Sequence, residues 1–303
     1  DEIIPYLSGD IPDMVNRPRV FGVFDPSDEK SSLYEHLIRA VEHSLTSGVH
    51  GLPLMGAADW NDGMNRVGVE GKGESMWLAW FIIAVLDEMS ILTLKRGDSG
   101  RAVRYRSHAK QYREALKKFG WDGRWYRRAF TDSGALVGTS NAKAFRLDSV
   151  TQSWAYFADG VTKESGMALQ SAKNELFIYD GHVPLAWPPS SRSVLDLGTI
   201  SDYPPGVREN ASQYNHAALW LAQAFFASGD PDAGMTIVDA VNPLKRSETK
   251  EKVAIYQGEP YVVAAEVYST PTYPGRAGWT WYTASAGVLY RTILEYILGL
   301  KRE

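Results

Sequence analysis

The chain has 303 residues, enough for one large domain or two ordinary ones. Its 32 Lys and Arg residues and 36 Asp and Glu residues give a net charge of −4. Nucleic-acid-binding proteins usually carry a basic excess, so this balance argues against that function class. The absence of Cys excludes a disulfide framework, a thiolate metal site and a Cys nucleophile. The 10 Trp and 16 Tyr residues are compatible with core packing and with stacking on sugars.

Helical periodicity dominates most of the chain. Residues 1–31 contain four prolines and are expected to form an extended or looped lead-in. Beyond them, apolar residues recur at helical spacing in one segment after another. We expect helices over residues 32–45, 74–94, 102–119, 149–159, 163–174, 212–228, 231–241 and 283–300.

The expected helices are of two kinds. Residues 74–94, 212–228 and 283–300 are apolar on nearly all sides, which is typical of buried helices. Residues 102–119 are amphipathic, and the side chains expected to face inward are Val103, Ala109, Tyr112, Leu116 and Phe119. This alternation, with long connecting loops, favours an all-α, two-layer α/α toroid. A plain helical bundle would explain the helices but not the loops.

The remaining stretches are less regular. Residues 121–130 indicate a turn and a short strand, and residues 181–208, with five prolines, are expected to be mostly loop. The longest apolar run, Met76 to Leu86, is too short to span a bilayer. No signal peptide is recognisable and the chain begins with Asp, so we expect a fragment of a longer protein or a processed chain.

The segment from Gly56 to Arg66 (GAADWNDGMNR) holds the densest set of polar groups. It places two carboxylates, two amides, an Arg and a Trp beside an apolar stretch, where polar groups are costly unless they are satisfied or used. Glycosyl transfer needs a protonated carboxylic acid beside the leaving oxygen and a platform for the sugar ring, which Trp60 could supply. A turn that caps the next helix is an equally good interpretation.

Two further segments combine polar residues with the start of an apolar helix. The first is YPPGVREN, from Tyr203 to Asn210, followed by His216. Capping by Glu209 and Asn210, with a satisfied core histidine, is the simpler interpretation. The second, around Thr283, could bind an anion at a helix N-terminus or could be an ordinary Thr cap.

Other common sites are missing from the sequence. The six His residues show no paired metal-ligand spacing, and no Walker A, GxGxxG or GxSxG motif is present. We therefore expect no metal and no bound cofactor.

Four strings in order along the chain, GLPLMGAADWNDGMNRVGVEGKGES, YPPGVREN, EPYVVAAEVYS and GWTWYTASAG, resemble glycoside hydrolase family 94, the inverting glycoside phosphorylases. The resemblance is strongest to the C-terminal phosphorylase-like domain of cyclic β-1,2-glucan synthases. It implies that residues 1–303 form the C-terminal two-thirds of one (α/α)6-barrel catalytic domain. Helices preceding this chain would then be needed to complete the barrel.

The resemblance also implies the site residues. Asp62, the second Asp of the DWND string, matches the general acid, and Trp60 matches a wall of the donor-sugar subsite. Tyr203, Arg208 and Glu209 match positions on the acceptor side. His216, Thr283 and Ala284 match the phosphate site. Asp59 has no implied catalytic role, and we expect it to support the loop.

The activity implied is inverting phosphorolysis of β-1,2-glucan to α-glucose 1-phosphate, a hexosyl transfer with phosphate as co-substrate. Phosphate is already a nucleophilic anion, so no second carboxylate is needed to activate water. In a synthase this reaction would control glucan chain length. The alternatives are a phosphorylase or hydrolase of another β-glucoside, such as a cellobiose-like one, and a catalytically silent glucan-binding module.

The expected partners are a β-glucan oligosaccharide and phosphate, with neither nucleic acid nor membrane contact by this segment. We expect a cytoplasmic location, as the soluble domain of an inner-membrane protein. The chain departs from the family pattern at three places. Ala284 follows the phosphate-site Thr in place of Gly, ENASQYNHA replaces ENGGQYTHA, and residues 180–189 differ from the common pattern.

Overall fold

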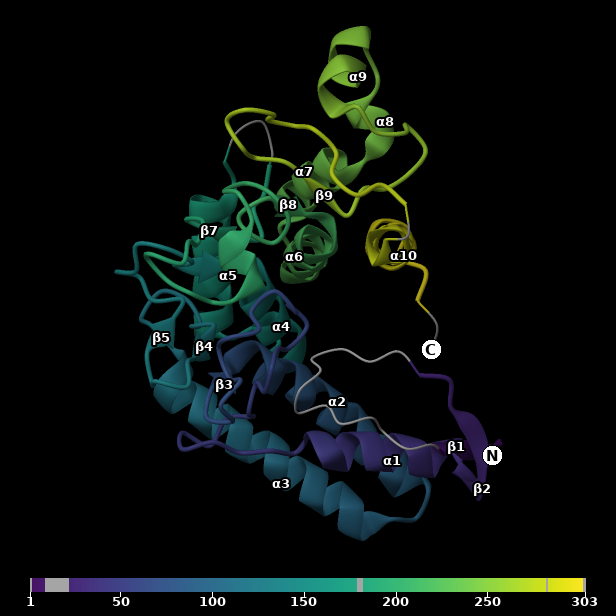
Figure 1. Cartoon of the computed structure of the whole chain (residues 1–303). Coiled ribbons are helices and arrows are strands. Elements are labelled where there is room, and N and C mark those ends of the chain that lie inside the picture. Colours follow the sequence, from purple (N-terminus) through teal and green to yellow (C-terminus); the bar gives the residue numbers. More distant parts are fainter. Residues whose placement is uncertain (1, 9–21, 179–181, 282, 302–303) are drawn as a thin grey trace. The chain divides into compact units, whose positions relative to one another are not determined.

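The computed structural model describes residues 2–8, 22–178, 182–281 and 283–301 (Figure 1). The chain divides into two compact units, Asp1–Thr46 and Ser47–Glu303. In the first unit, strand β1 (Ile3–Ser8) pairs antiparallel with β2 (Asp25–Ser32), and helix α1 (Leu33–Ser44) follows. The described ends of the expected lead-in are therefore extended and form a paired ladder. Residues 9–21 lie outside the described part.

Helix α1 begins where the sequence pattern predicts, because the Ser32 side chain accepts a hydrogen bond from the Glu35 N–H at 3.2 Å. Its apolar residues are unevenly buried. Ile38 is 1% exposed, whereas Leu33 and Leu37 are 45% and 42% exposed.

The second unit is built from two layers of helices. Four inner helices pack side by side in the order α2 (Met76–Lys95), α4 (Ser149–Asp159), α6 (Asn215–Ser228) and α10 (Ala284–Arg291). The outer helices α3 (Ser99–Ala115), α5 (Lys163–Leu176) and α7 (Pro231–Val241) pack on α2, α4 and α6, respectively. This arrangement confirms the all-α, two-layer expectation for the part of the chain that the structure describes.

Short strands precede three of the inner helices. In one sheet, β3 (Glu74–Ser75), β4 (Ala129–Phe130) and β5 (Leu136–Val137) pair in that order. Two-stranded sheets join β6 (Leu147–Asp148) to β7 (Ala186–Trp187) and β8 (Gln213–Tyr214) to β9 (Glu266–Val267). All of these pairings are antiparallel.

The inner helices start at one common end of this unit. Arg128 contacts the N-cap side chains of α2 and α4, Ser75 at 3.1 Å and Asp148 at 2.8 Å. The backbone of Leu185 bonds both the first residue of α4 and Ser212, which lies just before α6. As a result, the loops that enter the inner helices gather at this end, and these loops contain the motifs singled out in the sequence.

Several helix predictions need correction. Val103 is 66% exposed, and Ala102 and Tyr105 are buried in its place, whereas Ala109, Tyr112 and Leu116 of the predicted stripe are buried as expected. The helix predicted over 283–300 is π-helical from Thr292 to Ile297, and its buried residues are only Ser285 and Thr292 among those described. The pattern also missed α8 (Pro243–Arg246) and α9 (Lys250–Tyr256), which are short and rich in Lys.

Helix α2 is long and apolar enough to cross a membrane by length and composition, although the continuous apolar run within it is short. Half of its most apolar window is buried, and α3 and α4 pack against it. These contacts are those of a core helix.

Candidate functional site

The loop before α2 is held by a buried ion pair. Arg128 donates two hydrogen bonds to Asp59, each 2.6 Å long, and both side chains are at most 1% exposed. Asp59 also accepts hydrogen bonds from the Ser75 hydroxyl at 2.7 Å and from the Asn61 N–H at 3.0 Å. Asp59 therefore supports the loop, as expected. The α2 cap is Ser75, so the capping interpretation of the Asp-rich segment is wrong.

Asp62 and Glu209 lie near one another on two different loops. Asp62 is exposed, whereas Glu209 is 5% exposed. Burial is the largest cause that raises the pKa of Glu209, and the negative charge of Asp62 raises it further. Arg208, whose Nε lies 3.7 Å from Glu209 Oε2, and a hydrogen bond with Tyr214 act in the opposite direction. The structure thus brings the predicted general acid to the predicted acceptor-side carboxylate.

The acceptor-side loop is fixed by Asn210. Its amide donates to the Tyr203 carbonyl at 2.8 Å and to the Ser190 carbonyl at 3.0 Å. Gly206 has a φ of +83°, and a Cβ there would lie 2.3 Å from the Thr270 nitrogen, so only glycine fits. Helix α6 begins only at Asn215, so neither Glu209 nor Asn210 caps it.

A second buried carboxylate, Glu266, was missed by the sequence analysis. It is 1% exposed, and its strand β9 pairs with β8 so that Glu266 stands opposite Tyr214. The pKa of Glu266 is raised to about 7, chiefly by burial. The positive charge of Arg208 opposes this shift and the negative charge of Glu209 adds to it, so the three side chains form one electrostatic cluster. A Cβ on Gly278 would lie 2.2 Å from Glu266 Oε1, so any larger residue there would displace the Glu266 side chain. The EPYVVAAEVYS string was the available signal.

Trp60 and His216 meet in an aromatic cluster. The Trp60 ring lies 5.3 Å from the His216 ring, 5.1 Å from Trp220 and 5.8 Å from Tyr214, measured between centroids. The His216 ring is also 4.2 Å from Trp220. Burial lowers the pKa of His216 to about 4, so the imidazole is neutral near pH 7. It therefore offers one ring N–H, not a cation.

Helices α6 and α10 start side by side. The Asn215 amide donates to the Ala264 carbonyl at 2.8 Å, and the Thr283 hydroxyl donates to the Val263 carbonyl at 2.9 Å. Further along, Gln223 of α6 donates to the hydroxyl of Thr292 at 2.9 Å. Because the helices are tied at both points, they run in the same direction, and their N-termini lie together.

These two N-termini lack side-chain caps. Among the ten α-helices of the described residues, only α6 and α10 have an N-cap side chain that makes no capping hydrogen bond. Thr283 is the N-cap residue of α10, but its hydroxyl is used by Val263, so the ordinary-cap interpretation is wrong. The Asn215 N–H itself donates to the Ala265 carbonyl at 2.8 Å. Two neighbouring N-termini without side-chain caps favour an anion, because helix N-termini present N–H groups and the positive ends of helix dipoles.

Two of the residues that depart from the family pattern, Ser212 and Asn215, make hydrogen bonds within the fold. Ala211 has a φ of +69°, in the left-handed region that favours glycine. The Ser212 hydroxyl donates to the Arg208 carbonyl, and Asn215 makes the bond to Ala264 described above. Ala284 is exposed as the first residue of α10. Among the described residues no group of three or more His, Asp or Glu side chains is placed to hold a metal ion.

Comparison with known families gives a match along nearly the whole chain. A family model described as the Glycosyl hydrolase 94 superfamily, catalytic domain, matches residues 3–299. A solved structure described as a sialidase is similar in fold, with a TM-score of 0.60. The aligned region covers 89% of this chain and 24% of the sialidase chain. Its sequence identity is 14%, so this likeness concerns the fold alone.

Comparison with individual proteins gives similar relatives. The chain is 39% identical over 281 residues to the cyclic beta-(1,2)-glucan synthase NdvB of Rhizobium meliloti, covering 92% of this chain and 10% of NdvB. It is 29% identical to the solabiose phosphorylase of Paenibacillus borealis and 27% identical to the N,N'-diacetylchitobiose phosphorylase of Vibrio proteolyticus. These matches cover 88% and 99% of this chain, but only 35% of each phosphorylase.

Proposed function

Because the chain belongs to the Glycosyl hydrolase 94 superfamily, we propose that it is a glycoside phosphorylase domain that transfers a hexosyl group to phosphate. The observation that carries this proposal is the pair of uncapped helix N-termini at Asn215 and Thr283, at the end of the unit where the motif loops gather. An anion site is what a phosphorylase needs in place of the water-activating carboxylate of an inverting hydrolase.

In the proposed reaction Asp62 donates its proton to the glycosidic oxygen as the bond breaks. The Arg128–Asp59 pair beneath the loop fixes the backbone that carries Asp62, through the bond from Asn61 N–H to Asp59. Phosphate attacks the anomeric carbon from the opposite face, forms the new C–O bond in one displacement, and gives α-glucose 1-phosphate. The proton of Asp62 leaves with the released sugar hydroxyl.

The phosphate would be held by the N–H groups at the start of α10, the Thr283–Ala284 backbone among them, and by the neutral ring of His216. Trp60, packed against His216 and Trp220, would form a wall for the donor sugar. The acceptor side would be formed by Tyr203, Arg208 and Glu209, with the Arg208 guanidinium 5.9 Å from the centre of the Tyr203 ring.

Glu266 adds a carboxyl group that can accept or donate a hydrogen bond near neutral pH, because burial raises its pKa to about 7. Its Oε2 makes no hydrogen bond within the described part of the chain, and neither does Glu209 Oε2. Buried polar atoms without partners are costly, so a substrate hydroxyl is a natural partner for each.

We further propose that the row of inner helices is part of a closed (α/α)6 barrel, completed by chain outside residues 1–303. The support is the apolar surface along the last inner helix, where Tyr290, Ile293 and Ile297 are 65%, 38% and 40% exposed. Contiguous exposed apolar surface of this kind usually packs against another element.

The substrate we propose is β-1,2-glucan, supported by the 39% identity to a cyclic beta-(1,2)-glucan synthase. In a protein of that kind, phosphorolysis would set the length of linear chains before they are closed into rings. We place this unit in the cytoplasm as a soluble domain of an inner-membrane protein.

Incubating the full-length protein with linear β-1,2-glucan and inorganic phosphate tests the function. Formation of α-glucose 1-phosphate that depends on phosphate is the expected result. Glucose release without phosphate would show a hydrolase. Glucan binding with no product of either kind would show a silent binding module.

A further inference from the structure

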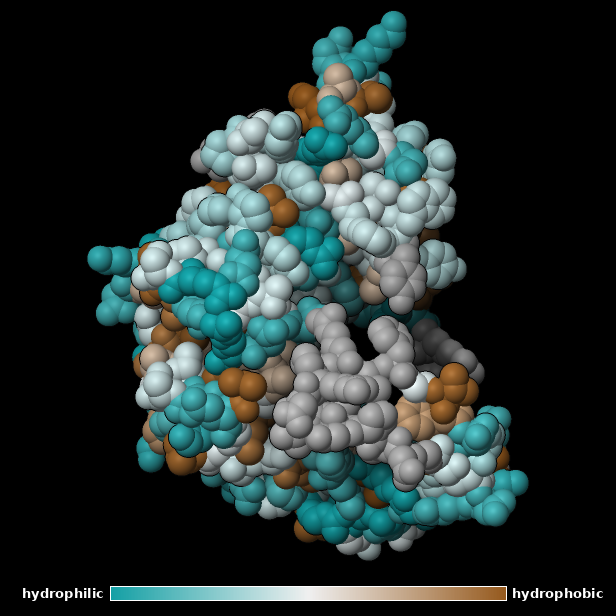
Figure 2. Space-filling view, viewed as in Figure 1, coloured by the Kyte–Doolittle hydropathy of each residue, from teal (hydrophilic) through white to brown (hydrophobic). Residues whose placement is uncertain are grey.

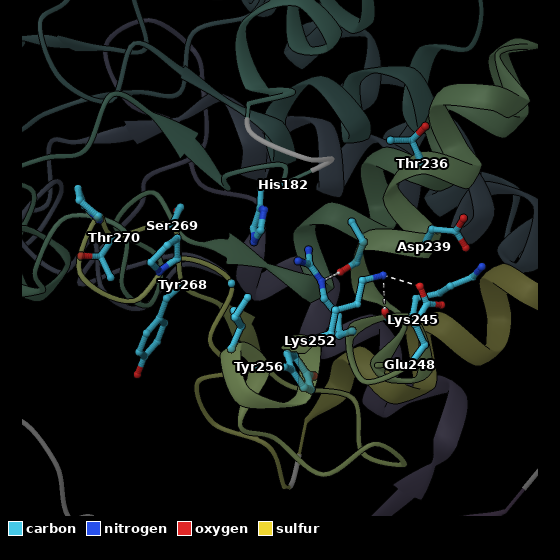
Figure 3. Close-up of a pocket in the computed structure, with 16 residues that line it drawn as sticks. His182, Thr236, Asp239, Lys245, Glu248, Lys252, Tyr256, Tyr268, Ser269 and Thr270 are labelled. Atoms are coloured by element: carbon cyan, nitrogen blue, oxygen red, sulfur yellow. Dashed lines mark hydrogen bonds and ion pairs between the residues drawn. The ribbon is translucent and has the colours of Figure 1, made fainter. Parts of the chain in front are cut away.

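A second cavity lies outside the candidate site. It has a volume of about 1040 Å³ and lies between α7, the α8–α9 segment and the hairpin at residues 268–275 (Figure 3). None of the residues assigned above to acid catalysis, sugar binding or phosphate binding lines it. Small-molecule pockets typically measure roughly 300–1,000 Å³, so this cavity has room for more than one sugar ring.

Two of the charged groups in the cavity pair with each other, and a third bonds to the backbone. The Lys252 ammonium donates to Glu248 at 2.5 Å and to the Lys245 carbonyl at 3.2 Å, and Arg246 Nε donates to the Ala240 carbonyl at 2.7 Å. With Lys245 and Asp239, the lining holds three basic and two acidic side chains, so the charges nearly balance. This lining therefore lacks the strong positive excess that would favour a phosphate-like anion, and it suits a neutral polar ligand.

The remaining lining alternates hydroxyl groups with flat apolar surface. Three aliphatic hydroxyls and the Tyr268 phenol stand beside an isoleucine and two prolines: Thr236, Ser269, Thr270, Ile255, Pro271 and Pro274. Ile255 is 54% exposed, and Figure 2 shows apolar side chains at the projecting tip that α8 and α9 form. Pyranose rings present the same mixture, apolar faces edged by hydroxyls, and bind well to such surfaces.

The cavity shares a wall with the acceptor-side loop. The Ser269 N–H donates to the Gly206 carbonyl at 3.0 Å, and the Ser269 hydroxyl donates to the Ala211 carbonyl. Ser269 and Thr270 thus line the cavity while their backbone supports the loop from Tyr203 to Asn210. Only this backbone segment would separate a sugar in the cavity from the proposed acceptor side.

We propose that this cavity is an accessory binding site for the neutral glucan chain, holding sugar residues distant from the bond that is cleaved. The proposal rests on the proposed function for the identity of the glucan. A second attachment point raises the effective concentration of chain at the cleavage site, so long glucans should bind more tightly than short ones by about an order of magnitude.

The test measures glucan binding to the full-length protein by calorimetry, without phosphate so that no phosphorolysis occurs. Thr236→Trp places a bulky ring at an exposed lining position of α7, and Met235→Trp places the same ring beside it, outside the lining. Thr236→Trp should weaken binding of long β-1,2-glucan about tenfold and leave binding of the β-1,2-linked disaccharide unchanged. Met235→Trp should leave both unchanged, and Asp239→Ala repeats the test with a smaller side chain.

Equal affinity of wild type, Thr236→Trp and Asp239→Ala for long glucan would overturn the proposal. A second result would also overturn it. If wild type binds inorganic phosphate but shows no preference for long glucan, and Thr236→Trp abolishes the phosphate binding, the cavity is an anion site. If wild type prefers long glucan and the lining variants remove this preference, the accessory site is supported. If the phosphorolysis assay at the same time yields no glucose 1-phosphate, only the proposed function is rejected.

Discussion

Arg128 and Asp59 form a bidentate ion pair that is completely shielded from solvent, with both hydrogen bonds 2.6 Å long. The two residues come from segments far apart in the sequence. The remaining guanidinium nitrogen, Nε, faces the carboxylate of Asp148 at 2.8 Å. One cation thereby joins the loop that carries Asp62 to the starts of α2 and α4.

Replacing Arg128 by Met should cost about 3–5 kcal/mol of unfolding free energy, because two buried carboxylates would lose their counter-charge. Chemical denaturation of the second unit measures this. Arg291→Met is the matched control, since Arg291 pairs with Glu295 but is 68% exposed, and it should change stability by less than about 1 kcal/mol. Equal effects of the two substitutions would contradict the role given to Arg128.

Substitutions of the two Asp residues of the loop should have different effects, one on activity and the other on stability. Asp62→Asn removes the proton donor and should lower phosphorolysis about 10²–10⁴-fold with an unchanged melting temperature, because Asp62 is exposed. Asp59→Asn breaks the buried pair with Arg128 and should lower the melting temperature. If Asp62→Asn keeps activity within a factor of two of wild type, Asp62 is not the general acid.

His216→Ala should raise the KM for phosphate more than the KM for glucan. Because burial lowers the pKa of His216 to about 4, the lost interaction is a neutral hydrogen bond of roughly 0.5–1.5 kcal/mol, a change of about 2- to 10-fold. Steady-state kinetics with each substrate varied in turn measures both constants. The same loss of affinity for both substrates would argue for a packing role beside Trp60 and Trp220.

Ala284→Gly should raise phosphate affinity or leave it unchanged, because Gly allows closer approach of an anion to the start of α10. The stability cost at this exposed first position should be at most about 1 kcal/mol. Ala286→Gly is the control on the same helix, since the Ala286 N–H is already bonded to the Thr283 carbonyl. A loss of phosphate affinity in Ala284→Gly, at an unchanged melting temperature, would mean that the loop does not bind phosphate as proposed.

Glu266 should make folding stability fall as pH rises. The pKa of its carboxyl is 4.5 in the reference state and about 7 in the fold, so the folded state favours the protonated form. This contribution is fully present below pH 4.5 and is lost as pH rises to about 7, up to about 3 kcal/mol in all.

Denaturation of Glu266→Gln at several pH values checks the sign. The variant should match wild type near pH 4.5 and be more stable near pH 8, whereas Glu88→Gln, at an exposed position of α2, should follow wild type throughout. A variant whose stability falls with pH as steeply as that of wild type would show that Glu266 is not the titrating group.

Local signals in the sequence determined the helices and the loops that precede them. The predicted spans 149–159 and 231–241 match α4 and α7, because Asp148 and Asp230 cap these helices and the apolar period is clear. Capping and periodicity involve residues within a few positions of one another, so they are readable without the fold. The expectation that Asp59 supports the loop came from the family resemblance, which gives it no catalytic role.

Tertiary structure alone decided which distant groups meet. Val103 and Ala102 are both small apolar residues one position apart, and only packing against α2 selects Ala102 for burial. Thr283 would cap a helix in isolation, but the Val263 carbonyl takes its hydroxyl and leaves the N-terminus of α10 free. Glu266 and Arg128 acquire their roles because strand pairing and burial bring them close to charges that are distant in the sequence. The energy of a buried charge depends on such neighbours, which the local sequence does not contain.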